Sequence, residues 1–356
     1  MAKGKGEQSP AFEVTSGVTL SRTLVPTLPP NYLSRKHLFE FLEQPSPSTT
    51  VVIAPVGYGK TSLVAEWALT RRDHLIWLTI TESDSLQDMS ALLIQATRNV
   101  IPGFAPWFEK EAEIRPVEIV RRWGNELLAT GREFIFVIDN FREQTSRDVD
   151  LASRLVEQFP SNLKFVTIRR DKIETAYETF SARGPLVVLG ASDLAFSESE
   201  VSTLAAMYKV DYSNPEIRHS LEAARGWPAA VTMLMHQIAK NKKPIDFEKV
   251  VASQTEPLRA LATSVINSLD EETRFLITSL AVVPEFTHEQ AEIILGKHYS
   301  YDAINQIALD GNYFSQTGSP EQTFEFSRLL REVLLTELRK DKERKIDIHS
   351  RLLEFH

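Results

Sequence analysis

A glycine-rich stretch lies between an apolar run and an amphipathic run, and it restricts the fold more than any other feature of this 356-residue sequence. The stretch reads Ala54-Pro55-Val56-Gly57-Tyr58-Gly59-Lys60-Thr61-Ser62. A strand is predicted before it over Thr50–Ala54, and a helix after it over Lys60–Arg71. Backbone N–H groups in such a loop converge on a phosphate, and the helix N-terminus adds its positive end. The pattern predicts a P-loop in which Ala54 replaces the first glycine of G-x-x-x-x-G-K-[ST].

The loop side chains have separate expected roles toward ATP or ADP with Mg²⁺. Gly57 and Gly59 let the backbone approach the phosphates, because neither carries a Cβ. Lys60 supplies positive charge to the β and γ phosphates, and the Thr61 hydroxyl is expected to ligate Mg²⁺. The loop residues expected to contact nucleotide are Val56, Gly57, Tyr58, Gly59, Lys60, Thr61 and Ser62. An ordinary strand-to-helix turn with a solvated Lys60 is the alternative, and the flanking strand and helix argue against it.

Strand and helix patterns alternate on both sides of this loop as far as residue 190. Further strands are predicted over His74–Ile80, Glu133–Asp139, Leu163–Arg169 and Leu186–Leu189, whose apolar cores suit doubly covered parallel strands. Further helices are predicted over Leu86–Val100, Val117–Thr130 and Arg147–Phe159, with Pro116 as a first helical residue and Ser146 as an N-cap. The alternation indicates an α/β domain with a parallel five-stranded sheet.

Helical periodicity dominates after residue 195. Ser197 and Glu200 form a capping-box pattern, and helices are predicted over Pro215–Arg225, Ala229–Lys240, Pro257–Ser268 and Glu271–Val282. A hairpin with arms Tyr313–Gln316 and Thr323–Phe326, turning at Gly318-Ser319-Pro320, accompanies short helices and indicates a winged helix. The expected organisation is an N-terminal arm (1–22), a nucleotide-binding domain (23–192), a helical domain (193–268), a winged helix (269–340) and the start of a helical arm (341–356).

Polar residues at two predicted strand ends are further candidates for the site. Asp139 ends an apolar strand and is expected to hold Mg²⁺ through water. Its neighbour Asn140 is neutral and cannot serve as a general base. Arg169 ends the next strand, where an arginine can sense a γ-phosphate, although a surface arginine paired with Asp171 is the alternative. Between two helices, Gly226-Trp227-Pro228 would cap one and start the other, or place Trp227 or Pro228 against the nucleotide base.

Composition excludes several other classes of protein. The net charge of −8 argues against a surface built to hold nucleic-acid phosphates, and the absence of cysteine excludes disulfides and thiolate metal sites. No signal-peptide core and no apolar run near the ~20 residues of a membrane span occur, so a cytoplasmic protein is expected. Neither a histidine metal motif nor a nucleophile elbow is present.

Taken in order from Leu24 to His356, these motifs resemble the STAND class of P-loop ATPases, and within it the large MalT-like regulators of the LuxR type. The family loop [AS]-P-A-G-Y-G-K-T-[ST] explains Ala54, and Gly226-Trp227-Pro228 matches intact. The family's Arg-x-x-Leu segment corresponds to Ser34-Arg35-Lys36-His37-Leu38, and its Ser-Arg after the fourth strand to Ile168-Arg169. Two motifs depart: hhhhDD-aromatic-His becomes Ile138-Asp139-Asn140-Phe141-Arg142, and aromatic-x-aromatic-His becomes Phe324-Glu325-Phe326-Ser327.

The resemblance implies a strand order of 5-1-4-3-2 and a nucleotide-operated switch that rests with ADP bound. It further implies nucleotide contacts by Ser34, Arg35 and Pro228, and catalytic roles for Lys60, Asp139 and Arg169, with Thr61 and Asp139 as the Mg²⁺ ligands. Sensor and effector domains would follow this chain, and activation would involve self-association. The expected function is the ATPase core of a bacterial transcriptional regulator, at most a slow ATPase. An actively hydrolysing AAA-type remodeller and a non-hydrolysing nucleotide-binding module are the alternatives.

Overall fold

A computed structural model describes the chain from Val18 to Phe355, except for residues 30, 82–83, 111–113, 142–155, 171–176, 183, 245–256, 268, 312, 318–322 and 327. The chain divides into two compact units. The first comprises Met1–Ile53 and Thr61–Leu189, and the second comprises Ala54–Lys60 and Gly190–His356. The chain therefore crosses between the units three times, twice at the ends of the glycine-rich loop.

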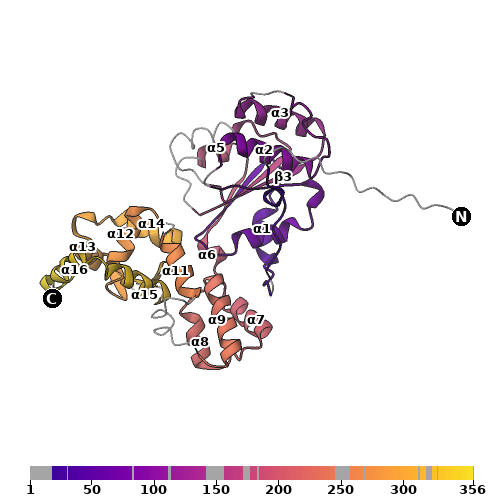
Figure 1. The fold of residues 1–356 in the computed structure, drawn as a ribbon. Helices are drawn as coiled ribbons and strands as arrows, with labels where there is room; N and C mark the ends of the chain where they lie inside the picture. Colours follow the sequence, from indigo (N-terminus) through magenta and orange to yellow (C-terminus); the bar gives the residue numbers. More distant parts are fainter. Residues whose placement is uncertain are drawn as a thin grey trace. The chain divides into compact units, whose positions relative to one another are not determined.

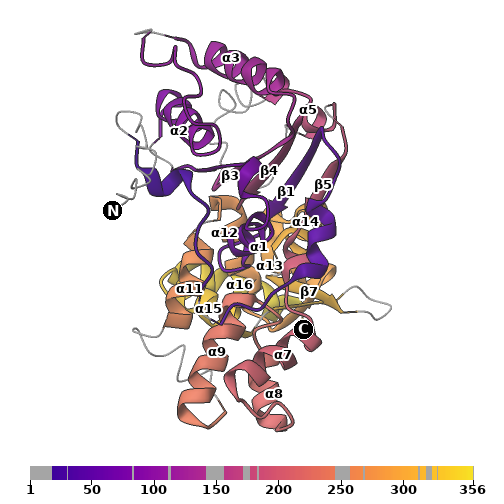
Figure 2. The same cartoon turned by 90° about the vertical axis from the view of Figure 1, so that its right-hand side faces the viewer.

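The first unit is built on a five-stranded sheet in the order β2-β3-β4-β1-β5, with every neighbouring pair parallel. Its strands are β1 (Ser48–Ile53), β2 (Leu75–Thr79), β3 (Phe134–Asp139), β4 (Leu163–Arg169) and β5 (Leu186–Leu189). Figure 2 shows β3, β4, β1 and β5 side by side in this order. The expected order 5-1-4-3-2 is the same order counted from the opposite edge, so the predicted sheet is confirmed.

Helices cover both faces of this sheet. They are α1 (Lys60–Ala68), α2 (Leu86–Arg98), α3 (Pro116–Ala129) and α5 (Tyr177–Ala182), with 3₁₀ turns η1 (Leu20–Thr23), η2 (Lys36–Leu42) and η3 (Arg72–His74). The connection from β1 to β2 runs across the sheet in the opposite direction to the later connections. Right-handed crossovers therefore place α1 on the face opposite α2, α3 and α5, as Figure 1 shows.

Local signals explain most of these boundaries. Pro116 is the first residue of α3, as predicted, because its missing N–H needs no partner there. Helix α1 ends at Ala68, three residues before the predicted end, where the Arg71 guanidinium donates to the Trp67 carbonyl at 2.8 Å. The helix predicted over 147–159, with its N-cap Ser146, lies mostly outside the described residues. The main core lies on the α2 and α3 side and includes the buried rings of Trp123, Phe136 and Phe165.

The second unit contains a helical part and a winged helix. The helical part comprises α6 (Ala191–Leu194), α7 (Glu198–Tyr208), α8 (Pro215–Glu222), α9 (Pro228–Asn241) and α11 (Pro257–Asn267). Helix α9 packs against α7 and α8, and the three lie together in Figure 2. Ser197 caps α7, and the predicted box with Glu200 is present.

The winged-helix part combines short helices with a small antiparallel sheet in the order β6-β8-β7. Its elements are α12 (Glu271–Leu280), β6 (Glu285–Thr287), α13 (His288–Leu295), η4 (Gly296–His298), α14 (Tyr301–Gly311), β7 (Phe314–Thr317), β8 (Thr323–Phe326), α15 (Arg328–Leu338) and α16 (Lys342–Phe355). The second hairpin arm has the predicted bounds and the first begins and ends one residue later than predicted, while the turn predicted at 318–320 lies outside the described residues. Strand β6 was not predicted, because three residues are too few for a recognisable alternation.

Candidate functional site

Three of the predicted site positions follow adjacent strands of the sheet. Strand β4 lies between β1 and β3, and Ile53 pairs with Arg169 while Asp139 pairs with Ile168. The carboxyl ends of these strands therefore lead into the glycine-rich loop, into the segment after Arg169 and into the segment after Asp139. In open α/β sheets this edge is where ligands bind, near the point where the crossovers reverse direction.

Thr61 and Asp139 are brought together within the first unit. The Thr61 hydroxyl donates to the Asp139 carboxylate, with its oxygen 3.1 and 3.2 Å from the two carboxylate oxygens. Asp139 is only 8% exposed because it ends a strand that is buried throughout. Hydroxyl and carboxylate oxygens are suitable ligands for Mg²⁺, which usually takes one or two protein oxygens, phosphate oxygens and waters. The described residues contain no cluster of three or more His, Asp or Glu side chains that could hold a metal without phosphate.

The backbone of the glycine-rich loop has the conformation that glycine favours. Gly57 and Gly59 have φ angles of +85° and +74°, and a Cβ on Gly59 would meet no atom within 4 Å. The buried Lys60 ammonium donates to the carbonyls of Ala54 and Pro55, the latter at 2.8 Å. Helix α1 begins at Lys60, so the loop leads directly into a helix N-terminus. A backbone that curls around its own lysine before a helix is a fitting cradle for phosphate.

The turn before α9, in the helical part of the second unit, also contacts the glycine-rich loop. The Trp227 indole donates to the Val56 carbonyl at 3.1 Å, and its ring stacks on Tyr58 with centroids 6.5 Å apart. The Ala229 N–H donates to the Gly57 carbonyl at 3.0 Å. These contacts explain why residues 54–60 group with the second unit. Trp227 thus packs on the loop itself, which sequence reasoning missed.

Two other predicted binding residues have clear structural positions. Pro228 is buried as the first residue of α9, and its contact with a nucleotide base remains a prediction. In the first unit, the Ser34 hydroxyl and the Arg35 N–H both donate to the carboxylate of Glu66 on α1, so this segment is tied to the helix that follows the loop. The buried Arg35 side chain and the exposed Ser34 therefore have fixed positions beside α1.

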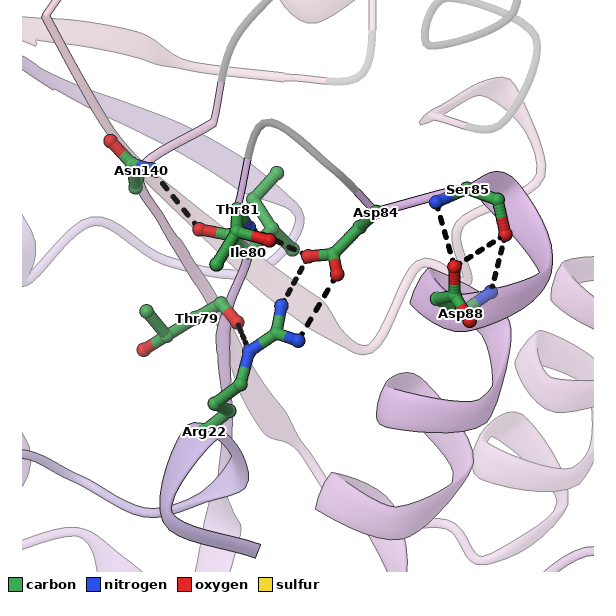
Figure 3. A network of polar contacts seen from close by, with 8 residues as sticks. All are labelled: Arg22, Thr79, Ile80, Thr81, Asp84, Ser85, Asp88 and Asn140. Atoms are coloured by element: carbon green, nitrogen blue, oxygen red, sulfur yellow. Dashed lines mark hydrogen bonds and ion pairs between the residues drawn. The ribbon is translucent and has the colours of Figure 1, made fainter. Parts of the chain in front are cut away.

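Asn140 follows Asp139 with φ +65°, in the left-handed region that asparagine tolerates better than most residues. Its amide donates to the Ile80 carbonyl at 3.1 Å (Figure 3). The Ile80 N–H in turn donates to the Asp139 carbonyl at 3.1 Å. Arg169 is 1% exposed and its guanidinium lies 5.2 Å from the centre of the Phe141 ring. The alternative of a surface Arg169 is therefore wrong, and its suggested partner Asp171 lies outside the described residues.

In the winged helix, Glu325 occupies the middle of the aromatic pair Phe324 and Phe326 on β8. Its carboxylate forms an ion pair with Arg225, at 2.5 Å, just before the Gly226-Trp227-Pro228 turn. Ser327, at the position of the family's histidine, lies outside the described residues. The hairpin and the turn are thus connected within the second unit by a side-chain contact that the sequence did not reveal.

The sheet order, the loop after β1 and the acid at the end of β3 define a P-loop-type α/β fold, followed by a helical part and a winged helix. Comparison with known families makes this more specific, because residues 262–346 match the MalT winged helix domain. The MalT transcriptional regulator of Vibrio parahaemolyticus is 23% identical over 317 residues, covering 85% of this chain and 35% of the relative. AlkS of Alcanivorax borkumensis is 25% identical over 285 residues, covering 79% of this chain and 31% of AlkS.

The chain is thus similar to MalT-type regulators, with its one family match at the MalT winged helix domain, and it spans about a third of the length of these curated relatives. Among solved structures, a STAND protein with a tetratricopeptide repeat sensor from Pyrococcus horikoshii aligns with a TM-score of 0.46 at 16% identity, over 95% of this chain and 47% of the other. The ORC2 protein of Aeropyrum pernix aligns with a TM-score of 0.46 at 12% identity, over 88% and 97%. None of the described helices has the length and apolarity needed to cross a membrane.

Proposed function

We propose that this chain is the nucleotide-binding switch core of a MalT-type transcriptional regulator, which binds ATP or ADP with Mg²⁺ and rests with ADP bound. The observation that carries the proposal is the loop between β1 and α1. Its two glycines have positive φ angles, Lys60 is buried at its end, and the next residue, Thr61, donates to a buried carboxylate at the end of β3. The lysine ammonium is complementary in charge to a phosphate, and the hydroxyl and carboxylate oxygens are ligands that suit Mg²⁺.

In this proposal each residue has a defined task. Lys60 neutralises charge on the β and γ phosphates, and Thr61 with Asp139 holds Mg²⁺, which screens the phosphate charge. Arg169 senses the γ-phosphate at the end of β4. Ser34, Arg35 and Pro228 contact the nucleoside. The loop residues Val56, Gly57, Tyr58, Gly59 and Ser62 complete the cradle.

Slow hydrolysis belongs to the same proposal. Asn140 stands where the family has a second acid, and its amide N–H is engaged by the Ile80 carbonyl. Its remaining amide oxygen can orient a water but cannot accept a proton at neutral pH, so no strong general base is available at this position. The expected state is therefore long-lived and nucleotide-bound, with sensor and effector domains as the partners that read it. Self-association on activation is a further part of this proposal.

Calorimetric titration with ADP and with ATP tests the assignment directly. Lys60→Ala and Thr61→Ala each remove a contact to phosphate or its metal, worth about 1.5–3 kcal/mol, so affinity should fall more than tenfold. Thr70→Ala is the matched control, because it removes a hydroxyl just beyond the other end of α1 and should leave affinity unchanged. Wild-type affinity in both loop variants would refute the site.

Turnover separates the proposal from its alternatives. Steady phosphate release at or above about 1 s⁻¹ would favour an AAA-type remodeller over a switch. ADP retained through purification, with release of phosphate far below that rate, supports the switch. Bound nucleotide that never changes the exchange or proteolysis of the protein would favour a structural nucleotide-binding module.

A further inference from the structure

A short N-terminal segment is fastened to the strand end beside Asp139. The 3₁₀ turn η1 contacts both β2 and α2, and Thr23 accepts two hydrogen bonds from the Asn99 amide, each 2.9 Å long, on its carbonyl and hydroxyl oxygens. The turn carries Arg22, whose side chain is only 23% exposed. This segment belongs to the first unit, as do β2, β3 and Asp139.

Arg22 makes three contacts with the last residue of β2 and with the loop that follows this strand (Figure 3). Its Nε donates to the Thr79 carbonyl at 3.0 Å, and its two terminal nitrogens form a bidentate ion pair with Asp84, one of them at 3.1 Å. The Asp84 carboxylate is 8% exposed and also accepts the Thr81 N–H at 2.6 Å. Because the guanidinium is planar and engages a backbone carbonyl and both oxygens of a carboxylate, it fixes the orientation of these two groups as well as the distance between them.

The same loop is bonded to the predicted metal ligand. Thr79 pairs with Asp139 across the two strands, and the Ile80 N–H donates to the Asp139 carbonyl. The next carbonyl, that of Ile80, accepts the Asn140 amide. Arg22 therefore fixes the loop that is hydrogen-bonded to the backbone of Asp139, whose carboxylate accepts the Thr61 hydroxyl. Its own contacts described above are to Thr79 and Asp84.

We propose that Arg22 is a positioning residue for the Mg²⁺ ligand Asp139, acting through Asp84 and the backbone of Thr79 and Ile80. The consequence for Mg²⁺ rests on the proposed nucleotide site, whereas the fixing of the loop by Arg22 does not depend on that site. The N-terminal segment is then a component of the site, and its release would loosen the metal ligand without altering the phosphate loop.

The test compares Arg22→Met with Arg71→Met in the full chain. Arg71 makes a similar set of contacts in the first unit, to the Trp67 carbonyl at 2.8 Å and to the Glu43 carboxylate, and its side chain is 29% exposed. It follows α1, beyond the end of that helix away from Thr61. Both substitutions keep the aliphatic stem and remove the guanidinium, so a general loss of stability should be similar.

Hydrogen exchange measures the positioning without nucleotide. Loss of charge-assisted bonds should speed exchange of the Ile80, Thr81 and Asp84 amides about tenfold in Arg22→Met and leave their exchange unchanged in Arg71→Met. Arg22→Lys keeps the positive charge but cannot form the bidentate pair with Asp84, so the exchange rates of these amides should increase by an intermediate amount. Wild-type exchange in a folded Arg22→Met, or in Arg22→Lys, would overturn the positioning role.

ATP titration in EDTA and in Mg²⁺ measures the consequence for the metal. The factor by which Mg²⁺ increases the affinity for ATP should be at least roughly threefold smaller in Arg22→Met than in the wild type, while the affinity for ATP in EDTA stays near the wild-type value. Faster exchange with an unchanged effect of Mg²⁺ would overturn the link to the metal. A wild-type protein that binds no ATP would refute the proposed function alone, since the exchange result would still decide whether Arg22 positions Asp139.

Discussion

Gly57→Ala and Gly59→Ala form a matched pair that tests how the loop is held. Both glycines have positive φ angles, so alanine at either position carries a similar backbone strain of about 1–2 kcal/mol. They differ in their surroundings. A Cβ on Gly57 would lie 2.8 Å from the Ala229 Cβ and 2.8 Å from the Trp227 Nε1, whereas a Cβ on Gly59 would meet nothing within 4 Å.

Gly57→Ala should therefore lower the free energy of unfolding by a further 1–3 kcal/mol, roughly the penalty for overpacking a close contact. Urea unfolding of the two variants gives the difference, and exchange of the Ala229 amide, which donates to the Gly57 carbonyl, locates it. Ala229→Gly in the Gly57→Ala background removes one of the two close contacts and should restore part of the loss. Equal destabilisation by the two alanines, with unchanged exchange at Ala229, would refute the contact between the loop and the turn at Trp227.

Three further predictions concern the Asp84 carboxylate, the junction between the two units at residues 190–193, and hydrolysis. Burial by itself would raise the pKa of Asp84, but hydrogen bonds from Arg22 and Thr81 together with the Arg22 charge outweigh burial and lower this pKa. The contribution of Asp84 to stability should therefore be complete above about pH 4 and be lost as pH falls through the lowered pKa, a dependence that Asp84→Asn should remove from urea titrations. Saturating ADP should protect residues 190–193 from limited proteolysis, and equal cutting with and without ADP would contradict a nucleotide-operated switch. Asn140→Asp should raise phosphate release and Asp139→Ala should abolish it, whereas robust wild-type turnover would show that water is activated elsewhere.

Local patterns were sufficient for most elements of the α/β sheet. Strand β3 is an uninterrupted apolar run buried on both faces, and β4 and β5 begin and end at the predicted residues. The order of the strands did not follow from these runs, because pairing depends on contacts between residues far apart in the chain. That order came from the resemblance. Strand β6 escaped prediction because its three residues owe their pairing to β8 and not to their own pattern.

The candidate site was predictable where it follows a local motif and not where it depends on distant contacts. The loop, its lysine and the acid at the end of β3 each follow a recognisable strand. Trp227 and Val56 are 171 residues apart, and Arg22 and Asp84 are 62 apart. A single tryptophan or arginine in one sequence does not indicate its partner, since many positions would suit either side chain. Only the folded chain brings Trp227 to the loop and Arg22 to the strand end beside Asp139.

Asn140 connects the stability of this strand end with its chemistry. Its backbone has a positive φ, which both asparagine and aspartate tolerate, so the backbone alone does not require an amide. The side-chain contact does require an amide, because an amide donates to the Ile80 carbonyl and a carboxylate cannot. Ile80 belongs to the loop that Arg22 also contacts. A carboxylate there would repel that carbonyl and turn toward solvent or a bound water, where it could accept a proton. Asn140→Asp should therefore lower the free energy of unfolding by about 1 kcal/mol and speed hydrolysis. A variant that loses this stability but hydrolyses no faster would show that the amide serves the fold alone.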